Sequence, residues 1–282
     1  AVSTFPLGPV IAWVTNPAAS TVSTGPPETY SDMVNRVQTI KEKEDKDWNG
    51  YIWQGGPNEG LTIMWLNWLW GMGGSIHQDG KLKVNTDKGV KALQHARDLI
   101  YKDEVSPRSV VSGRTDQNRQ TFQNGSTLFM RNWTYAFAVM NKEGSPVKDK
   151  FDVTTMPTHA DYPDANNSCL GGWNTFVNRF SSNKEAAKKF CYYMATDDVQ
   201  ASLAVDYSHL PVQKKIYDND KYVEQFPQLQ VFKDALQSTS ARPATPKYTT
   251  FSKIVYTNLN ASLSKQKSPQ KALDDAQKKI DS

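Results

Sequence analysis

The chain has 282 residues, more than one compact hydrophobic core usually needs, so two lobes and one large domain are both allowed. Its 33 Lys and Arg against 29 Asp and Glu give a net charge of +4, spread without a basic block, which argues against a nucleic-acid partner. Aromatic residues make up 11% of the chain, and four of the eight tryptophans, Trp53, Trp65, Trp68 and Trp70, fall in one short segment.

Residues 1–25 are rich in Pro, Gly, Ser, Thr and Ala, and only Val10 to Val14 has the pattern of a strand. Beyond them, Thr29 is a suitable N-cap for a helix from Tyr30 to about Lys43. Residues 58–72 are apolar nearly all round a helix, which should therefore be buried or lend one face to a ligand. The other elements predicted in this half are strands at 51–54, 82–85 and 127–131 and helices at 87–102 and 116–124, the last closed by Gly125.

The second half alternates in the same way. Strands are predicted at 151–156 and 173–178, and helices at 184–194, 199–205, 228–236, 248–263 and 269–280. Asn183 is the expected cap of the first of these helices, and Ser268 with Pro269 begins the last one. Strands that alternate with helices predict an α/β sheet architecture, and no fixed period suggests a solenoid.

Cysteine content and hydropathy say little about location. Cys169 and Cys191 could form one disulfide, but the sequence leaves their pairing open. No charged and then apolar leader opens the sequence, and no apolar run reaches the roughly eighteen residues of a membrane span. We expect a soluble chain, whose export signal, if it has one, lies outside the printed sequence.

Residues 169–178, Cys-Leu-Gly-Gly-Trp-Asn-Thr-Phe-Val-Asn, form the most informative motif. Gly171 and Gly172 allow the backbone to come close to a ligand, and Trp173 offers a flat face that suits a sugar ring. Taken alone, such a motif is more often a turn followed by a core aromatic residue. Its significance therefore depends on other segments of the chain.

Two other segments accompany this motif: 129–136, Phe-Met-Arg-Asn-Trp-Thr-Tyr-Ala, and 241–248, Ala-Arg-Pro-Ala-Thr-Pro-Lys-Tyr. In this order and at this spacing, the three segments resemble the extracellular solute-binding proteins (family 1) of bacterial ABC sugar importers, most closely their maltose and trehalose branch. The resemblance runs from about Pro26 to the C-terminus. It also includes residues 27–32, 59–60, 65–74, 124–125, 210–212, 268–269 and 272–273.

The resemblance implies a type II, periplasmic-binding-protein-like fold of two α/β lobes joined by crossing segments. In that fold, residues 26–147 and 198–282 would form a complete C-terminal lobe, and residues 148–197 would belong to the N-terminal lobe. Family members carry roughly a hundred residues, the size of a small domain, before the motif Pro27-Glu28-Thr29. We therefore expect a chain without most of the N-terminal lobe, in which residues 1–25 are a linker or a remnant of that lobe or of the hinge.

This expectation has a physical consequence for the residues assigned to the N-terminal lobe. The strands at 151–156 and 173–178 and the helix at 184–194 should expose an apolar face and open sheet edges. Dimerisation, swapping or aggregation would follow. Sugar binding would also be weak, because a two-lobed clamp gains affinity by closing both walls on its ligand.

The resemblance also implies the ligand contacts. Indole faces stack on sugar rings, and fixed donors and acceptors replace the water around hydroxyl groups. The expected contact residues are Trp173 and Trp133 for stacking, Tyr135 for stacking or hydrogen bonding, Arg242 as a donor, Gly171 and Gly172 as close backbone, and Glu59 near the cleft. From the residues alone, Trp133 and Tyr135 fit a hydrophobic core as well, and Arg242 fits a solvated surface charge better.

An enzyme is the first alternative, because tryptophans beside acids also occur in glycosidases, whose two carboxylates lie about 5 to 9 Å apart. The adjacent acid pairs 161/164 and 197/198 look like turn and cap residues instead. No Gly-x-Ser-x-Gly elbow or Gly-rich phosphate loop occurs, and the four histidines lack metal-ligand spacing. We predict no catalytic residue, no metal and no cofactor.

The sequence therefore predicts a non-enzymatic, exported binding protein. It would capture an α-linked di- or oligosaccharide, of the maltose or trehalose kind, between its lobes and deliver it to the membrane subunits of an ABC permease. Its place would be the periplasm or the outer face of the cell membrane, with lipid anchoring left open. A glycoside-acting enzyme and a carbohydrate-binding module without a transport role are the alternatives.

Overall fold

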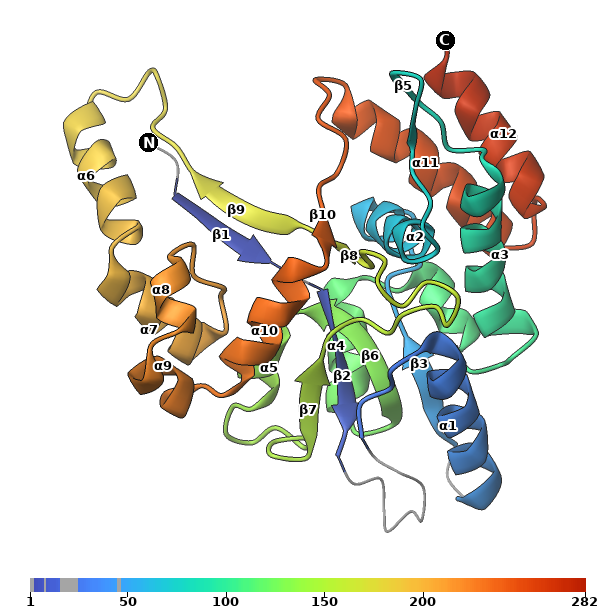
Figure 1. The fold of residues 1–282 in the computed structure, drawn as a ribbon, viewed down its shortest axis with the longest axis horizontal. Helices are drawn as coiled ribbons and strands as arrows, with labels where there is room; N and C mark the ends of the chain where they lie inside the picture. Colours follow the sequence, from blue (N-terminus) through green and yellow to red (C-terminus); the bar gives the residue numbers. More distant parts are fainter. Residues whose placement is uncertain (1–2, 8, 16–24, 45–46) are drawn as a thin grey trace.

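The computed structural model describes residues 3–7, 9–15, 25–44 and 47–282. These residues form two unequal parts, which are clearly separated in Figure 1. The larger part is built on a four-stranded sheet, and the smaller part contains a two-stranded ribbon with several helices. The first two strands, β1 (Ser3–Leu7) and β2 (Pro9–Val14), belong to different parts, so the chain passes from one to the other between them.

The central sheet has the strand order β3-β6-β2-β7, with β3 at Asn49–Ile52, β6 at Thr127–Trp133 and β7 at Phe151–Thr154. β3 runs parallel to β6, whereas β2 is antiparallel to both β6 and β7. β6 is buried at every position except Trp133, so both of its faces are covered. The helices that contact the sheet are α1 (Tyr30–Lys43), α4 (Thr115–Gln123) and α10 (Gln228–Gln237).

A second layer of the larger part is helical. Its members are α2 (Glu59–Gly71), α3 (Asp87–Tyr101), α11 (Tyr248–Leu263) and α12 (Pro269–Ile280). α2 packs against both α3 and α11 and is buried along nearly its whole length, which confirms the prediction from its apolar pattern. Trp65 and Trp68 of α2 are buried in the core of the larger part. The Trp68 and Trp53 rings meet edge to face, with 5.0 Å between their centroids. The tryptophan cluster is therefore mainly packing.

The helix boundaries follow local capping chemistry. Thr29 Oγ1 accepts a hydrogen bond from the Asp32 amide at 3.1 Å, and Ser268 Oγ accepts one from the Lys271 amide at 3.2 Å. Gly125 follows α4 with φ at +75°, a conformation that costs a glycine little. These positions could be predicted because each cap satisfies orphan backbone groups within one turn.

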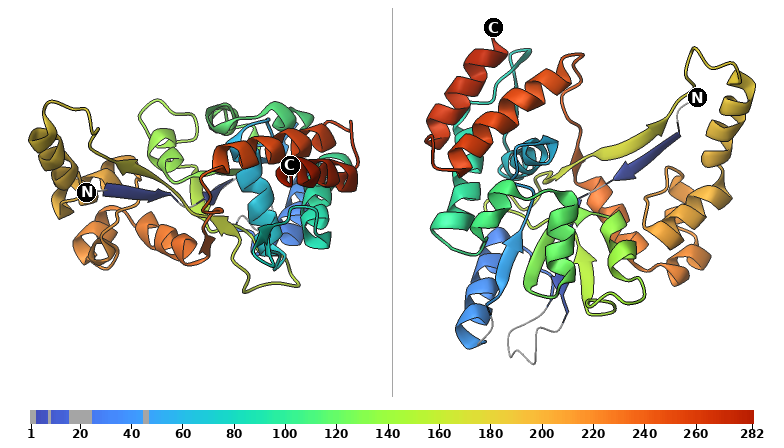
Figure 2. Two further views of the ribbon diagram at one scale, coloured as in Figure 1. Left: turned by 90° about the horizontal axis from the view of Figure 1, so that it is seen from above. Right: turned by 180° about the vertical axis from the view of Figure 1, so that it is seen from behind.

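The smaller part is held together by a ribbon of β1 and β9 (Gly171–Thr175), paired antiparallel from Ser3↔Thr175 to Leu7↔Gly171. Its helices are α6 (Lys184–Met194), α7 (Asp197–Tyr207), α8 (Lys214–Tyr217) and α9 (Asp220–Gln225). Figure 1 and the reverse view in Figure 2 both place α6 beside this ribbon. Only Cys191 of α6 is buried.

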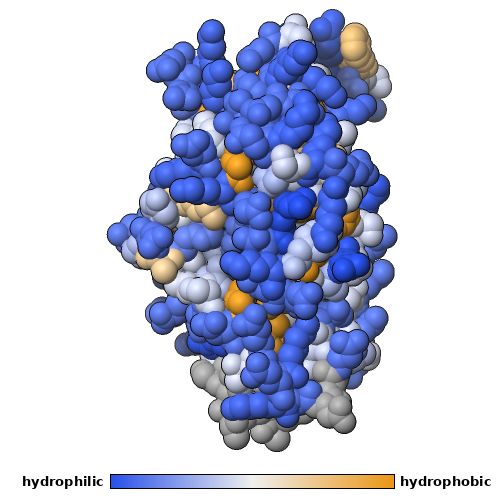
Figure 3. Space-filling view, turned by 90° about the vertical axis from the view of Figure 1, so that its right-hand side faces the viewer, coloured by the Kyte–Doolittle hydropathy of each residue, from blue (hydrophilic) through white to orange (hydrophobic). Residues whose placement is uncertain are grey.

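Large apolar side chains are exposed in the smaller part, as predicted for residues 173–178 and 184–194, whereas the prediction was wrong for 151–156, whose apolar residues Phe151, Val153 and Met156 are buried in the larger part. The exposed side chains are Trp173, Phe176, Phe180, Phe190, Tyr192, Tyr193 and Tyr207. By contrast, the outer face of the larger part is mostly hydrophilic, with small and separate apolar areas (Figure 3). No helix in the described part of the chain combines the length and apolar character that a bilayer crossing needs.

Three structural details differ from the sequence prediction or go beyond it. The strand at 151–156 was expected in the N-terminal lobe with residues 173–178, but its backbone pairs with β2 in the four-stranded sheet. β1 was not predicted, because it is defined by its pairing with β9 and not by a local pattern. Cys169 and Cys191 are both free thiols, so no disulfide joins them.

Several short elements were also missed. They are the strands β4 (His77–Gln78), β8 (Ser168–Cys169) and β10 (Thr239–Ser240), the helices α5 (Tyr135–Met140), α8 and α9, and a 3₁₀ turn at Arg108–Ser112. The predicted strand at 82–85 is reduced to β5 (Lys81–Leu82). Such elements are too short to show a period of hydrophobicity.

His95 should make the stability of the fold depend on pH. Its ring lies between Tyr30, Trp68 and His159, with centroid distances of 5.0 to 5.7 Å, and burial lowers its pKa to about 3. The unfolded chain therefore binds a proton below pH ~6.5 that the folded chain does not, so stability should fall as pH falls from 6.5 toward 3. We expect His95→Gln to remove about 1.4 kcal/mol per pH unit from that slope.

Urea denaturation of parent and variant between pH 7 and 4 measures this difference. The matched control is His77→Gln, because His77 is exposed in β4 and its replacement should leave the slope unchanged. Equal slopes for His95→Gln and the parent chain would contradict the assignment.

Candidate ligand-binding site

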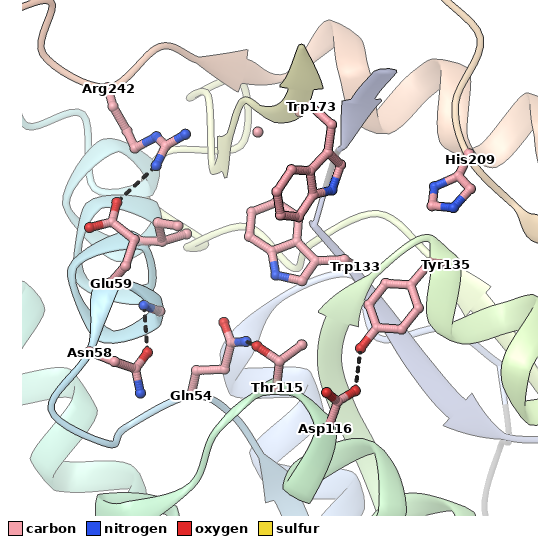
Figure 4. Close-up of a pocket in the computed structure, with 14 residues that line it drawn as sticks. Gln54, Asn58, Glu59, Thr115, Asp116, Trp133, Tyr135, Trp173, His209 and Arg242 are labelled. Atoms are coloured by element: carbon pink, nitrogen blue, oxygen red, sulfur yellow. Dashed lines mark hydrogen bonds and ion pairs between the residues drawn. The ribbon is translucent and has the colours of Figure 1, made fainter. Parts of the chain in front are cut away.

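A cleft of about 590 Å³ lies where the smaller part faces the larger part. All seven residues predicted to contact a ligand line it: Glu59, Trp133, Tyr135, Gly171, Gly172, Trp173 and Arg242. Figure 4 shows that their labelled side chains come from different elements and converge on one cavity. The structure thus brings together residues that lie up to 183 positions apart in the chain.

Strand pairing explains why these distant segments meet. β3 and β6 run parallel, so the residues at their carboxyl ends, Gln54 and Trp133, reach the same edge of the sheet. β8 and β10 also pair in parallel, with Ser168↔Thr239 and Cys169↔Ser240. Gly171 and Arg242, which follow these two short strands, are therefore brought to the same wall.

Two indole rings face the cavity from opposite parts of the molecule. Trp173, on β9, is 67% exposed, so it is available for stacking and is not a core residue. Trp133 ends β6 and is partly buried, with the Arg131 guanidinium carbon 4.3 Å from the centroid of its ring. Both side chains point into the same cavity in Figure 4.

Glu59 is the centre of a hydrogen-bond network at one end of the cleft. Its Oε1 accepts from Arg242 Nη1 at 2.8 Å and from the Tyr248 hydroxyl at 2.5 Å, and its Oε2 accepts from the Ser252 hydroxyl. Burial is the largest single effect and lowers the pKa of Arg242, but the hydrogen bond to Glu59 and the charge interactions with Tyr248, Cys169 and Glu59 together raise that pKa above its usual value. The guanidinium is therefore fixed in place while its other N–H groups remain for a ligand.

Tyr135 and Asp116 form a second polar group on the cleft wall. The Tyr135 hydroxyl donates to Asp116 Oδ1 at 2.9 Å, and Arg119 Nε lies 3.6 Å from the same oxygen. Burial, together with this carboxylate, raises the pKa of Tyr135 to about 12. The phenol thus stays protonated at neutral pH, and Tyr135 lines the cavity next to an acceptor, Asp116.

The cleft also contains polar residues that the sequence analysis missed: Gln54, Asn58, Thr115, Asp116 and His209. Asn58 is the N-cap of α2, where its Oδ1 accepts from the Gly60 amide at 2.8 Å. Thr115 and Asp116 are the first two residues of α4, directly after its N-cap Arg114. Gln54 and Asn58 follow β3, and polar residues just after such a strand are the signal that could have found these two, because ligands gather at such edges of α/β sheets.

The polar groups that line the cleft are suited to hydrogen bonding rather than to bond cleavage. Both carboxylates, Glu59 and Asp116, already accept hydrogen bonds from neighbouring side chains. Burial lowers the pKa of His209, so it is uncharged at neutral pH. No group of His, Cys, Asp and Glu among the described residues has the arrangement of a metal site. The cleft therefore offers aromatic faces and fixed, mutually neutralised polar groups.

Comparison with known proteins identifies the family. A sequence profile described as bacterial extracellular solute-binding protein matches residues 6–230. The chain belongs to this family. A probable ABC transporter-binding protein of Deinococcus radiodurans is 32% identical over 256 residues, which cover 88% of this chain and 60% of that protein. The chain thus spans about 60% of the length of this curated relative.

Solved structures confirm the mixed α/β, periplasmic-binding-protein-like fold. Maltose-bound MalE3 of T. maritima superimposes with a TM-score of 0.90 at 30% identity, covering 98% of this chain and 71% of its own. A tagatose-bound ABC transporter solute-binding protein of Thermotoga lettingae has a TM-score of 0.84 at 21% identity, with 99% and 70% covered. The second likeness supports the fold alone.

The Glu59 network should contribute measurably to stability. We expect Glu59→Gln to lower the free energy of unfolding by about 1 kcal/mol, because the amide cannot accept from Arg242, Tyr248 and Ser252 as the carboxylate does. Urea denaturation at pH 7 measures the change. Glu185→Gln is the matched control, because the exposed Glu185–Lys188 pair of α6 should contribute close to nothing. Equal losses in the two variants would argue against the network.

Proposed function

We propose that this chain is the substrate-binding component of a bacterial ABC importer and that it captures a sugar or polyol in the cleft. The observation that carries the proposal is the convergence of Trp133 and Trp173 on a cavity lined by hydrogen-bonding groups. Family membership supports the transport role. In that role the protein acts outside the cytoplasm and delivers its ligand to membrane permease subunits.

The physical case for a carbohydrate rests on two complementary surfaces. The C–H face of a pyranose is apolar and packs on an indole, whereas its hydroxyl groups need donors and acceptors in place of water. Arg242 supplies donors at one end of the cleft, and Asp116 supplies acceptors beside Tyr135. Because each charged group has an opposite or hydrogen-bonded neighbour, a neutral ligand is favoured over an anionic one.

We further propose an α-linked di- or oligosaccharide of the maltose or trehalose kind. The likeness to maltose-bound MalE3, at 30% identity, supports a maltose-like ligand. A cavity of about 590 Å³ lies within the ~300 to 1,000 Å³ range of small-molecule pockets. In this proposal Trp133 and Trp173, on different walls of the cleft, each stack on one sugar ring of the ligand.

The exposed aromatic side chains of the smaller part bear on partners as well. Phe176, Phe180 and Phe190 present apolar surface to solvent. Exposed apolar patches of this kind mark contact sites in many proteins. We propose self-association through this face, and analytical ultracentrifugation of the purified chain tests it.

A panel of sugars tests the function. Titration calorimetry with maltose, trehalose, maltotriose, mannitol and glucose 6-phosphate should show binding of at least one neutral sugar and none of the phosphorylated one. Trp173→Ala should weaken that binding about tenfold, on the scale of the up to about 1.5 kcal/mol that stacking on one aromatic ring contributes. The matched control is Phe180→Ala, because Phe180 is 80% exposed outside the cleft.

Three outcomes would contradict the proposal. Parent-like binding by Trp173→Ala would remove the stacking role. Failure of the whole panel would remove the carbohydrate ligand. Release of glucose from maltose during incubation would favour a glycoside-acting enzyme over a transport receptor.

A further inference from the structure

Arg131 carries a positive charge in the protein interior, where burial of a charge costs free energy. Its side chain is fully buried in β6, and none of the ion pairs found among the described residues includes it. Burial lowers its pKa to about 10, so it still carries its charge at neutral pH. An apolar side chain of similar size would avoid the loss of hydration, which suggests that this position serves more than packing.

The contacts of Arg131 lead to the cleft wall. Its Nη1 donates to Gln54 Oε1 at 2.7 Å, and its guanidinium carbon lies 4.3 Å from the centroid of the Trp133 ring. Arg131 and Trp133 are two residues apart on one strand and so point to the same side of the sheet. Gln54 and Trp133 both line the cavity, whereas Arg131 stands behind them.

The contact with Gln54 fixes the direction of an amide. Arginine has donors and no acceptor, so the atom of Gln54 that faces it must be the oxygen. The amide nitrogen is thereby turned to the other side, where it donates to the Thr115 hydroxyl. Figure 4 shows this nitrogen directed along the cleft floor toward Thr115. One N–H is used in this bond, which leaves the second for an oxygen of a ligand.

We propose that Arg131 is a positioning residue that presents the Gln54 amide to the cleft as a donor and holds the Trp133 ring from behind. This inference rests on the proposed function for the identity of the ligand, a neutral sugar. It adds that the Gln54 amide donates a hydrogen bond to an oxygen of the sugar, which accepts it. Arg131 itself does not touch the ligand.

Binding of maltose to four variants tests the inference. Arg131→Met should weaken binding about tenfold, because the amide is free to flip and the ring loses its support. Arg131→Lys keeps a donor for Gln54 Oε1 and should lose about threefold or less. In a Gln54→Leu background, Arg131→Met should cost clearly less than in the parent, because the two residues act through one contact.

Stability separates positioning from a merely structural role. Arg131→Met should unfold at the same urea concentration as the parent or a higher one, since it removes an unpaired buried charge. Arg97→Met is the matched control: Arg97 donates to the Ser262 carbonyl away from the cleft, so its loss should lower stability and leave affinity unchanged. If Arg131→Met does not fold, the Arg131→Lys variant and its cycle with Gln54→Leu decide the question.

A measurement without ligand keeps this inference separate from the proposed function. The side-chain amide resonances of Gln54, identified as the pair absent in Gln54→Leu, should shift in Arg131→Met and exchange faster with water. Unchanged resonances, parent-like affinity of Arg131→Met, or additive losses in the double variant would each overturn the role of Arg131. If the parent chain binds no sugar of the panel, the proposed function falls, and the amide resonances alone decide the inference.

Discussion

The structure depends most on the pairing of β6 with its two neighbours, because this strand is at once the centre of the sheet and the support of the cleft. Its parallel partner β3 brings Gln54 to the same edge, and its antiparallel partner β2 completes the core behind it. Burial of both faces leaves β6 no freedom to shift register, since a shift of one residue would turn Trp133 and Arg131 to the opposite side. The position of the Trp133 ring is therefore fixed by the packing of the core and not by the loops.

The cleft combines fixed polar groups with two aromatic surfaces, and its charges are satisfied before any ligand arrives. Glu59 is held by three donors, and Asp116 by a phenol and a guanidinium. Groups that are already oriented lose little freedom when they bind, so more of the contact energy is available for affinity. This organisation is consistent with the proposed role of a receptor for a neutral sugar.

Much of this arrangement could be predicted from sequence, where the signal was local or carried by a family resemblance. The caps at Thr29 and Ser268 and the buried helix α2 follow from spacing within one or two turns. Six of the seven predicted site residues come from three motifs whose order matched a known family, Glu59 comes from the separate stretch 59–60, and the structure gathers all seven in one cleft. By contrast, β1 and the true partner of β7 depend on pairing between distant segments, which no local pattern records. Gln54 and Asp116 were missed because a single polar residue after a strand, or at the start of a helix, resembles an ordinary turn or capping residue.

The pairing of the first two strands determines which part of the molecule positions each indole of the cleft. Leu7, near the end of the β1 ribbon, pairs with Gly171, whereas Pro9, at the start of β2, pairs with Trp133. The backbone thus reaches both walls within three residues, and Trp173 lies further out along the ribbon, opposite Phe5. Trp133 is thereby positioned by the central sheet and Trp173 by the ribbon, so the separation of the two rings depends on how the ribbon lies relative to the sheet.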